Sequence, residues 1–191
     1  CSSATYGFTY GGQNSGSLDI NVIERFPFET QTNSTDWADC SVSQHGAAGC
    51  SSPTHGYAVN ATRHANIPPN VPTGTIINNI DKFPFSSQTN ATDIGDLTVV
   101  RSGGAGISSC DHGYQAGGAQ SVTNPNNGAP QWTRTEIDKF SFASDGNSTD
   151  HGDLPLETGA GASHGAGISG LTHGYHCGGI YSYNNQGHQY P

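Results

Sequence analysis

The sequence contains no methionine, and only 11% of its 191 residues are charged. Lys and Arg total 6 against 15 Asp and Glu, which gives a formal net charge of -9. A surface of that sign repels phosphate backbones, so the composition argues against nucleic-acid binding. No apolar run approaches the roughly 18 residues that a membrane span needs. Because no methionine precedes Cys1, we expect a processed product or a fragment.

The usual signatures of catalysis are also missing. There is no Gly-x-Ser-x-Gly elbow, phosphate-binding loop or dinucleotide fingerprint. Carboxylates are plentiful, but they lie at repeated turns instead of forming one distinct pair. No Cys-x-x-Cys pair supports a structural zinc site. We therefore expect a protein that is not an enzyme and that carries no cofactor. Calcium is the one candidate ion.

Five cysteines stand in a chain that also has 27 glycines. This combination favours disulfides formed in an oxidising compartment, and thus an extracellular protein, either secreted or on a virion or cell surface. An odd count leaves one thiol free, paired between chains, or modified. The opening Cys1-Ser2-Ser3 also resembles the processed end of a bacterial lipoprotein, although a plain processed N-terminus looks the same. The disulfide candidates are Cys1, Cys40, Cys50, Cys110 and Cys177.

A repeated phrase is the main positive feature of the sequence. It reads Ile-Glu-Arg-Phe-Pro-Phe from Ile23, Ile-Asp-Lys-Phe-Pro-Phe from Ile80 and Ile-Asp-Lys-Phe-Ser-Phe from Ile137. Each copy is followed by an Asn-x-Thr-Asp turn, at Asn33, Asn90 and Asn147, with a spacing of 57 residues. A fixed period of that size indicates a small folding unit copied in tandem.

A second phrase fills the interval between the first ones and contains His-Gly-Tyr at His55, His112 and His173. The N-terminal copy has Tyr6 in place of the histidine, and this alignment puts Cys1 at the position of Cys50. Since an aromatic residue replaces the histidine in one copy, we expect a packing or hydrogen-bonding role for these histidines, in preference to metal binding.

Each unit can be divided into four short strands. The first ends in Ile-Ser-Ser or its equivalent, the second runs from His-Gly-Tyr to a pair of glycines, and the third ends in Phe-x-Phe. The fourth is predicted over residues 96–100 and 153–156, and residues 118–131 are predicted to be a surface loop. Alternation with a period of two, bounded by Gly, Asn and Ser, predicts an all-β protein.

Four short strands in a unit of about this length are typical of a β-propeller blade. The Gly-Gly ending, the aromatic third strand and the Asn turn resemble kelch repeats. The wording of the phrases resembles a divergent kelch-like group that occurs in phage structural proteins and in uncharacterised bacterial and environmental proteins. The pattern departs from kelch at residues 58–61, where the glycine pair is absent, and in the fourth strand, where only Trp37 lies near the usual tryptophan position.

The resemblance implies a single repeat domain over residues 1–191 made of three blades and part of another. We expect a partial blade at 1–12, repeat units at about 13–61, 62–118 and 119–179, and a tail at 180–191. Three third strands stand against four second strands, whereas propellers generally need about four blades to close. Either the residues belong to a longer propeller, or neighbouring subunits complete one another's sheets in a closed oligomer or a fibre. We favour assembly.

The Asn turns are the candidate sites of modification and ion binding. Four Asn-x-Thr sequences match the glycosylation sequon, although tight turns use the same residues. The candidate glycosylation sites are Asn33, Asn60, Asn90 and Asn147. The third turn also spaces oxygen ligands of the kind that Ca²⁺ prefers, without the closing Glu of an EF-hand. The calcium candidates are Asp145, Asn147, Asp150 and Asp153.

Two functional hypotheses follow. The first is a non-enzymatic extracellular or virion-associated structural protein that assembles through its incomplete blades. The alternative is a carbohydrate-binding (lectin-like) or adhesion module, with glycans as partners. The tail over residues 181–190 suggests this alternative, because its aromatic and amide side chains suit stacking and hydrogen bonding to a sugar.

Overall fold

The computed structural model describes residues 1–16, 18–63, 75–120, 122–123, 130–131, 134–155 and 162–181. The regular elements in these ranges are β-strands paired in antiparallel sheets, which confirms the predicted all-β class. None of these ranges contains a helix long and apolar enough to cross a membrane.

The first sheet joins three strands in chain order. These are β1 (Tyr6–Tyr10), β2 (Ile20–Pro27) and β3 (Thr35–Gln44). Ser2 forms one further antiparallel bridge with Gly7. Ser2 therefore stands where the first strand of a four-stranded unit is expected.

The second and third sheets each contain four strands in the predicted order. The second sheet consists of β4 (Ala48–Ser51), β5 (His55–Arg63), β6 (Thr75–Pro84) and β7 (Thr92–Asp96). The third consists of β8 (Ala105–Ser108), β9 (His112–Ala116), β12 (Glu136–Ser141) and β13 (Thr149–Asp153). Each sheet continues across a predicted unit boundary, at 61/62 or 118/119, because the second strand is hydrogen-bonded to the third.

A C-terminal hairpin follows, formed by β15 (Ala166–Ser169) and β16 (Gly174–Cys177). Its register, with Ser169 opposite Gly174, repeats the pairing of the first two strands of the third sheet. The flanking strands β14 (Ala162–Ser163) and β17 (Ile180–Tyr181) form a separate pair. Among the described residues the hairpin has a first and a second strand, and no third or fourth strand pairs with it.

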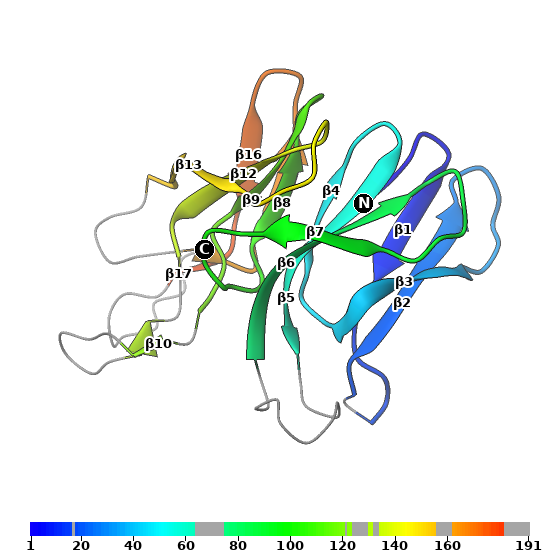
Figure 1. Ribbon diagram of the computed structural model, residues 1–191, viewed down its shortest axis with the longest axis horizontal. Helices are drawn as coiled ribbons and strands as arrows, with labels where there is room; N and C mark the ends of the chain where they lie inside the picture. The colour runs from blue at the N-terminus through cyan, green and yellow to red at the C-terminus, as the bar shows by residue number, and fades with distance from the viewer. Residues whose placement is uncertain are drawn as a thin grey trace.

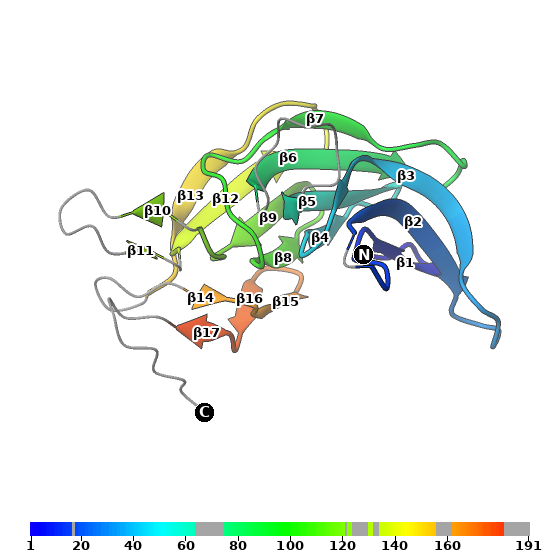
Figure 2. The ribbon, with the colours of Figure 1, turned by 90° about the horizontal axis from the view of Figure 1, so that it is seen from below.

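Figures 1 and 2 show the sheets side by side in chain order, from β1–β3 to the C-terminal hairpin. One hydrogen bond recurs at each step between their first strands. The amide of Ser2 donates to Ser51 Oγ at 3.0 Å, that of Ser51 to Ser108 Oγ at 2.9 Å, and that of Ser108 to Ser169 Oγ at 2.9 Å. The repeated bond shows that successive units stack in the same way.

Glycines allow the first strands to approach this closely. A Cβ atom added at Gly106 would overlap the carbonyl of Gly49, and one added at Gly167 would overlap the carbonyl of Gly106. Backbone therefore lies against backbone where β4, β8 and β15 meet, and larger residues would force the sheets apart.

The glycine pair that is missing at residues 58–61 has a local replacement. Asn60 has φ 48°, close to the values of 63° at Gly11, 64° at Gly117 and 67° at Gly178. Asparagine tolerates this left-handed conformation better than most residues. The chain therefore makes the same bend in the second sheet without glycine, and β5 continues beyond it to Arg63.

Two strand predictions were wrong in their details. The fourth strands end at Asp96 and Asp153, where they were expected to begin, because the residues after Asp96 leave the sheet to contact the next one. Thr98, for example, donates its amide and hydroxyl to Asp138 of the third sheet. The predicted loop at 118–131 contains a two-residue antiparallel pair, β10 (Val122–Thr123) with β11 (Pro130–Gln131).

Candidate functional site: the grooves between neighbouring sheets

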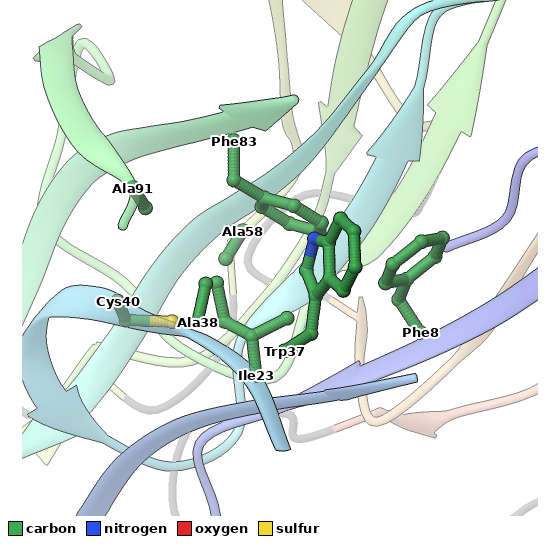
Figure 3. Packing of buried hydrophobic residues seen from close by; sticks show 8 residues of the cluster. All are labelled: Phe8, Ile23, Trp37, Ala38, Cys40, Ala58, Phe83 and Ala91. Carbon is green, nitrogen blue, oxygen red and sulfur yellow. The ribbon is translucent and has the colours of Figure 1, made fainter. Parts of the chain in front are cut away.

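An apolar groove lies between the first and second sheets and is filled by two phenylalanines. Phe83 of β6 and Phe85, which directly follows this strand, lie against Phe8 of β1, with ring centroids 5.5 and 4.9 Å from that of Phe8. Figure 3 shows the rings of Phe83, Trp37 and Phe8 packed close to one another. We call this the first closed groove, and its wall is formed by Cys1, Phe8, Tyr10, Ile23, Trp37 and Cys40.

The second closed groove repeats this arrangement between the second and third sheets. Phe140 and Phe142 of the β12 segment lie against Tyr57, with ring centroids 5.4 and 4.8 Å apart. Tyr57 is 0% exposed and Phe140 is 2% exposed. The wall consists of Cys50, Tyr57, Val59, Ile80, Ile94 and Leu97. Burial of such a side chain stabilises a fold by about 1.5–3 kcal/mol, so packing of the phenylalanine pair contributes strongly to the interface between units.

A third groove has a wall built from the equivalent positions of the repeat, but among the described residues no phenylalanine pair fills it. It is a cavity of about 340 Å³ between the third sheet and the C-terminal hairpin, whose residues 170–174 and His176 form its other side. Each residue of its wall stands 57 positions after its counterpart in the second closed groove. We call it the open groove, with the wall Ile107, Tyr114, Ala116, Ile137, His151 and Leu154.

The open groove is more polar than the closed ones. His151 replaces Ile94, and its ring lies 5.3 Å from that of Tyr114. His176 faces the groove from the hairpin, and burial lowers its pKa below the usual value. The neutral imidazole is therefore favoured at physiological pH, so the groove carries no fixed positive charge from this residue.

Buried carboxylates accompany the closed grooves. At the first one, Asp81 accepts hydrogen bonds from the amide and hydroxyl of Ser41, at 2.8 and 2.6 Å, and from Asn79 Nδ2 at 3.0 Å. Asp81 is fully buried, and desolvation raises its pKa above the usual range. Its partners are all neutral, so hydrogen bonds alone stabilise the ionised form.

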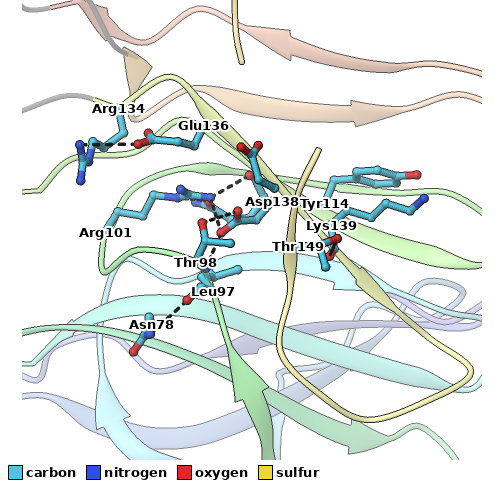
Figure 4. Close-up of polar contacts among 12 residues, drawn as sticks. Asn78, Leu97, Thr98, Arg101, Tyr114, Arg134, Glu136, Asp138, Lys139 and Thr149 are labelled. Atoms are coloured by element: carbon cyan, nitrogen blue, oxygen red, sulfur yellow. Dashed lines mark hydrogen bonds and ion pairs between the residues drawn. The ribbon is translucent and has the colours of Figure 1, made fainter. Parts of the chain in front are cut away.

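At the second closed groove the equivalent carboxylate also has a cation. Asp138 accepts bonds from the amide and hydroxyl of Thr98, at 3.0 and 2.7 Å, and pairs with Arg101 at 3.0 Å (Figure 4). The side chains of Arg101 and Asp138 are both 0% exposed. Burial lowers the pKa of Arg101, and the charge of Asp138 opposes that shift. At the open groove the position of Ser41 and Thr98 is occupied by Pro155, which has neither an amide hydrogen nor a hydroxyl.

The four predicted calcium ligands have separate protein partners. Asp145, Asn147, Asp150 and Asp153 accept hydrogen bonds, in that order, from Lys82 Nζ, Asp96 N, Gly152 N and Thr135 Oγ1, at 2.8–3.0 Å. Within the described part of the chain, no three His, Cys, Asp or Glu side chains are grouped to hold a metal ion. Calcium binding remains a prediction, and these contacts do not support it.

Three of the four sequon asparagines are exposed, namely Asn33, Asn90 and Asn147. Asn90 Oδ1 accepts a bond from the amide of Asp39 at 3.1 Å, and Asn147 Oδ1 accepts one from Asp96 at 3.0 Å. These asparagines thus bind the preceding sheet, where the turn interpretation expected bonds within the turn itself. The fourth, Asn60, is only 1% exposed and has no room for a glycan in the folded chain.

The disulfide prediction was wrong for pairs within the chain, because all five cysteines are free. Cys1 and Cys50 occupy equivalent positions in two different groove walls, as the sequence alignment predicted. Burial raises the pKa of Cys50 to about 11, and burial together with Asp81 raises that of Cys40 to about 12. These two thiols are protonated packing residues, and Cys110 and Cys177 are exposed.

The hydrogen-bonding role predicted for the repeated histidines is confirmed at two of them. His55 Nδ1 lies 2.9 Å from Thr54 Oγ1, and His173 Nδ1 lies 2.9 Å from Thr172 Oγ1. His112 instead has its ring 6.4 Å from that of Tyr114. Residues 182–190 of the tail, which suggested sugar binding, lie outside the described residues.

The grooves themselves were missed at the sequence level. Their signal was present as a wall of apolar residues recurring at the 57-residue spacing, but it is spread over all four strands. A scan against protein-family models finds no family that matches this chain, and a search of curated proteins finds no match either.

Proposed function

We propose that this chain is a non-enzymatic structural protein, extracellular or virion-associated, whose sheets are kelch-like blades and which assembles head to tail. One observation carries the proposal. Phe28 at one end of the row and Tyr175 at the other are each 55% exposed. Their equivalents stack on each other in the closed grooves, where Phe142 lies against Tyr57.

The Phe28 face and the Tyr175 face can pack against each other in the same way as neighbouring sheets do inside the chain. Phe28 of one copy can lie against Tyr175 of the next, beside the exposed side chain of Ile168. The serine ladder supports the same direction, since Ser169 N in one copy would face Ser2 Oγ in another. Apolar surface that is exposed on a monomer and rimmed by polar residues is typical of an association site. A head-to-tail contact of this kind builds a ring or a fibre.

The extracellular location depends on the three exposed sequons, Asn33, Asn90 and Asn147. The free cysteines remove the support that disulfides would have given. The net charge of -9 keeps such an assembly soluble and away from nucleic acid.

Sedimentation equilibrium over a range of concentrations tests the assembly. The wild-type chain should exceed the 19.8 kDa of one copy as its concentration rises. Phe28→Ser and Tyr175→Ser should each prevent this, whereas Leu18→Ser, a substitution at another exposed apolar residue, should not. A wild-type mass that stays at one copy throughout would contradict the proposal.

A mixture of the two variants gives a sharper test. The Phe28→Ser chain keeps its Tyr175 face, and the Tyr175→Ser chain keeps its Phe28 face. Head-to-tail assembly therefore predicts that the mixture stops at a dimer of one copy of each. Continued growth of the mixture, or no association at all, would show that these two faces do not pair.

A further inference from the structure

Among the described residues, no Phe-x-Phe pair fills the open groove, whereas one such pair fills each closed groove. Its six wall residues stand at the positions that surround Phe140 and Phe142 in the second closed groove, and it retains the aromatic ring, Tyr114, on which that pair would stack. The first closed groove has the same six positions and is filled by Phe83 and Phe85. In both closed cases the filling is a third strand with the sequence Phe-x-Phe.

The backbone partner for such a strand is also in place. In the three sheets the second strand pairs with the first on one side and with the third on the other, apart from the single Ser2 bridge in the first sheet. The strand β16 is a second strand, and among the described residues it pairs only with β15. An edge strand beside an apolar groove suits the addition of an extended segment, with main-chain bonds for affinity and pockets for specificity.

We infer that the open groove is an acceptor site for a β-strand carrying Phe-x-Phe, which adds antiparallel to the edge of β16. The inference rests on the proposed function, because it names the partner of the C-terminal hairpin. The register follows from the filled units. Phe83 stands opposite Gly56 and Phe140 opposite Gly113, so the first phenylalanine of the incoming strand stands opposite Gly174.

The small residue at Gly174 matches this register. A Cβ atom added at Gly7, Gly56 or Gly113 would overlap the ring of the phenylalanine opposite, namely Phe26, Phe83 or Phe140. Glycine at these positions leaves room for the ring. At Gly174 the nearest atom to an added Cβ is Ile107 Cγ2 at 2.6 Å, so Ile107 lies in the space that the ring takes in the filled units and must move aside for the incoming phenylalanine.

The open groove also has its own selectivity. Asp81 and Asp138, two residues before the first phenylalanine of their strands, bind the amide and hydroxyl of Ser41 and Thr98. Pro155 stands at that position beside the open groove and can donate no hydrogen bond. A carboxylate buried there would be unpaired, which is costly. The preferred strand therefore has a neutral residue where the inner strands have aspartate.

A peptide titration tests the inference. The probe is a fluorescein-labelled peptide with the sequence of residues 135–143, and the protein is the Phe28→Ser variant, whose assembly face is removed. Fluorescence anisotropy should show saturable binding at one peptide per chain. Replacing both phenylalanines of the peptide by serine should weaken binding at least about tenfold, since two apolar side chains lose their burial. Replacing the peptide's aspartate by asparagine should strengthen it.

Changes in the peptide leave the protein untouched, so these results do not depend on a variant that folds poorly. Tyr114→Ala in the protein should also weaken binding about tenfold, with circular dichroism as the check on folding. Absence of saturable binding, or equal binding of the serine peptide, would overturn the inference. Binding to the Phe28→Ser chain but not to the wild-type chain would overturn it too, because the peptide would then occupy the Tyr175 face that a second copy covers.

The two proposals fail separately. If wild-type protein assembles and the peptide does not bind, only the acceptor site is wrong. If the peptide binds and wild-type protein remains a single copy at every concentration, only the head-to-tail assembly is wrong.

Discussion

The second closed groove and the open groove have the same wall in two different states. Around Tyr57 the wall is covered by Phe140 and Phe142, and Tyr57 is fully buried. At the open groove the equivalent residue, Tyr114, is only half-buried, and the opposite side is the C-terminal hairpin. The apolar wall of each unit is therefore not buried by the strands of that unit alone. The third strand of each following unit completes the core of the unit before it.

The two closed grooves differ from each other in their buried charge. Asp81 has only neutral partners, whereas Asp138 pairs with Arg101. Gln44, which stands 57 residues before Arg101, is buried and uncharged. The same backbone arrangement therefore tolerates a carboxylate with a cation or without one, provided that hydroxyl and amide donors surround it.

Removing a phenylalanine from a closed groove should have the largest effect on stability. Phe140→Ala should lower the free energy of unfolding by about 3–5 kcal/mol, because it opens a cavity in the fully buried cluster. Phe28→Ala, at an exposed position of the same repeated phrase, should change it by about 0.5 kcal/mol or less. Urea denaturation measures both values when each substitution is made in the Tyr175→Ser chain, which is expected to remain a single copy. Equal effects would mean that the two positions are not in different states.

Removing the buried cation should have the next largest effect. Arg101→Met should cost about 3 kcal/mol, because Asp138 is left buried without a counter-charge. The matched control is Gln44→Met, which removes no charge at the equivalent position and should cost about 1 kcal/mol. The double variant Arg101→Met/Asp138→Asn should recover most of the loss. If Gln44→Met cost as much as Arg101→Met, the charge pair would not distinguish the two interfaces.

The carboxyl of Asp81 should make stability depend on pH. Its pKa is raised by burial, so the folded chain holds this proton more tightly than the unfolded chain does. Its contribution to the free energy of unfolding is full below the unfolded pKa and is lost as the pH rises through the folded pKa. Asp81→Asn lacks this titration, so its stability relative to wild type should improve as the pH rises from below the unfolded pKa of the carboxyl through its folded pKa. A relative stability that fell over that range would refute the assignment.

The asparagine contacts between sheets should have a smaller effect. Asn147→Ala removes the acceptor for the amide of Asp96 and should cost about 1 kcal/mol. The matched control is Asn33→Ala, since no described sheet precedes Asn33 and its equivalent contact is missing. Thermal unfolding of the two variants should therefore differ, and similar losses would mean that the bond to the preceding sheet contributes little.

Much of the fold was predictable because the repeat is local in sequence. The alternation in Ile80–Phe85 and the glycines after Tyr114 define the second and third strands directly. The ends of the fourth strands were not predictable, because Thr98 leaves its sheet to bind Asp138, a contact across 40 residues. The cysteines were misread for a similar reason. Their number in a glycine-rich chain suggests disulfides, but Cys1 and Cys50 take equivalent places in two different groove walls.

Hydrogen exchange in an extended chain tests most directly whether the open groove is an unfilled copy of the closed ones. The extension repeats residues 134–155, a third and fourth strand, after Pro191. The amides of Gly174–Cys177 should then exchange as slowly as those of His112–Ala116, because β16 gains a partner on its open edge. A control extension with Phe140→Ser and Phe142→Ser should give little protection. Unchanged fast exchange at Gly174–Cys177 in the extended chain would contradict the equivalence of the open and closed grooves.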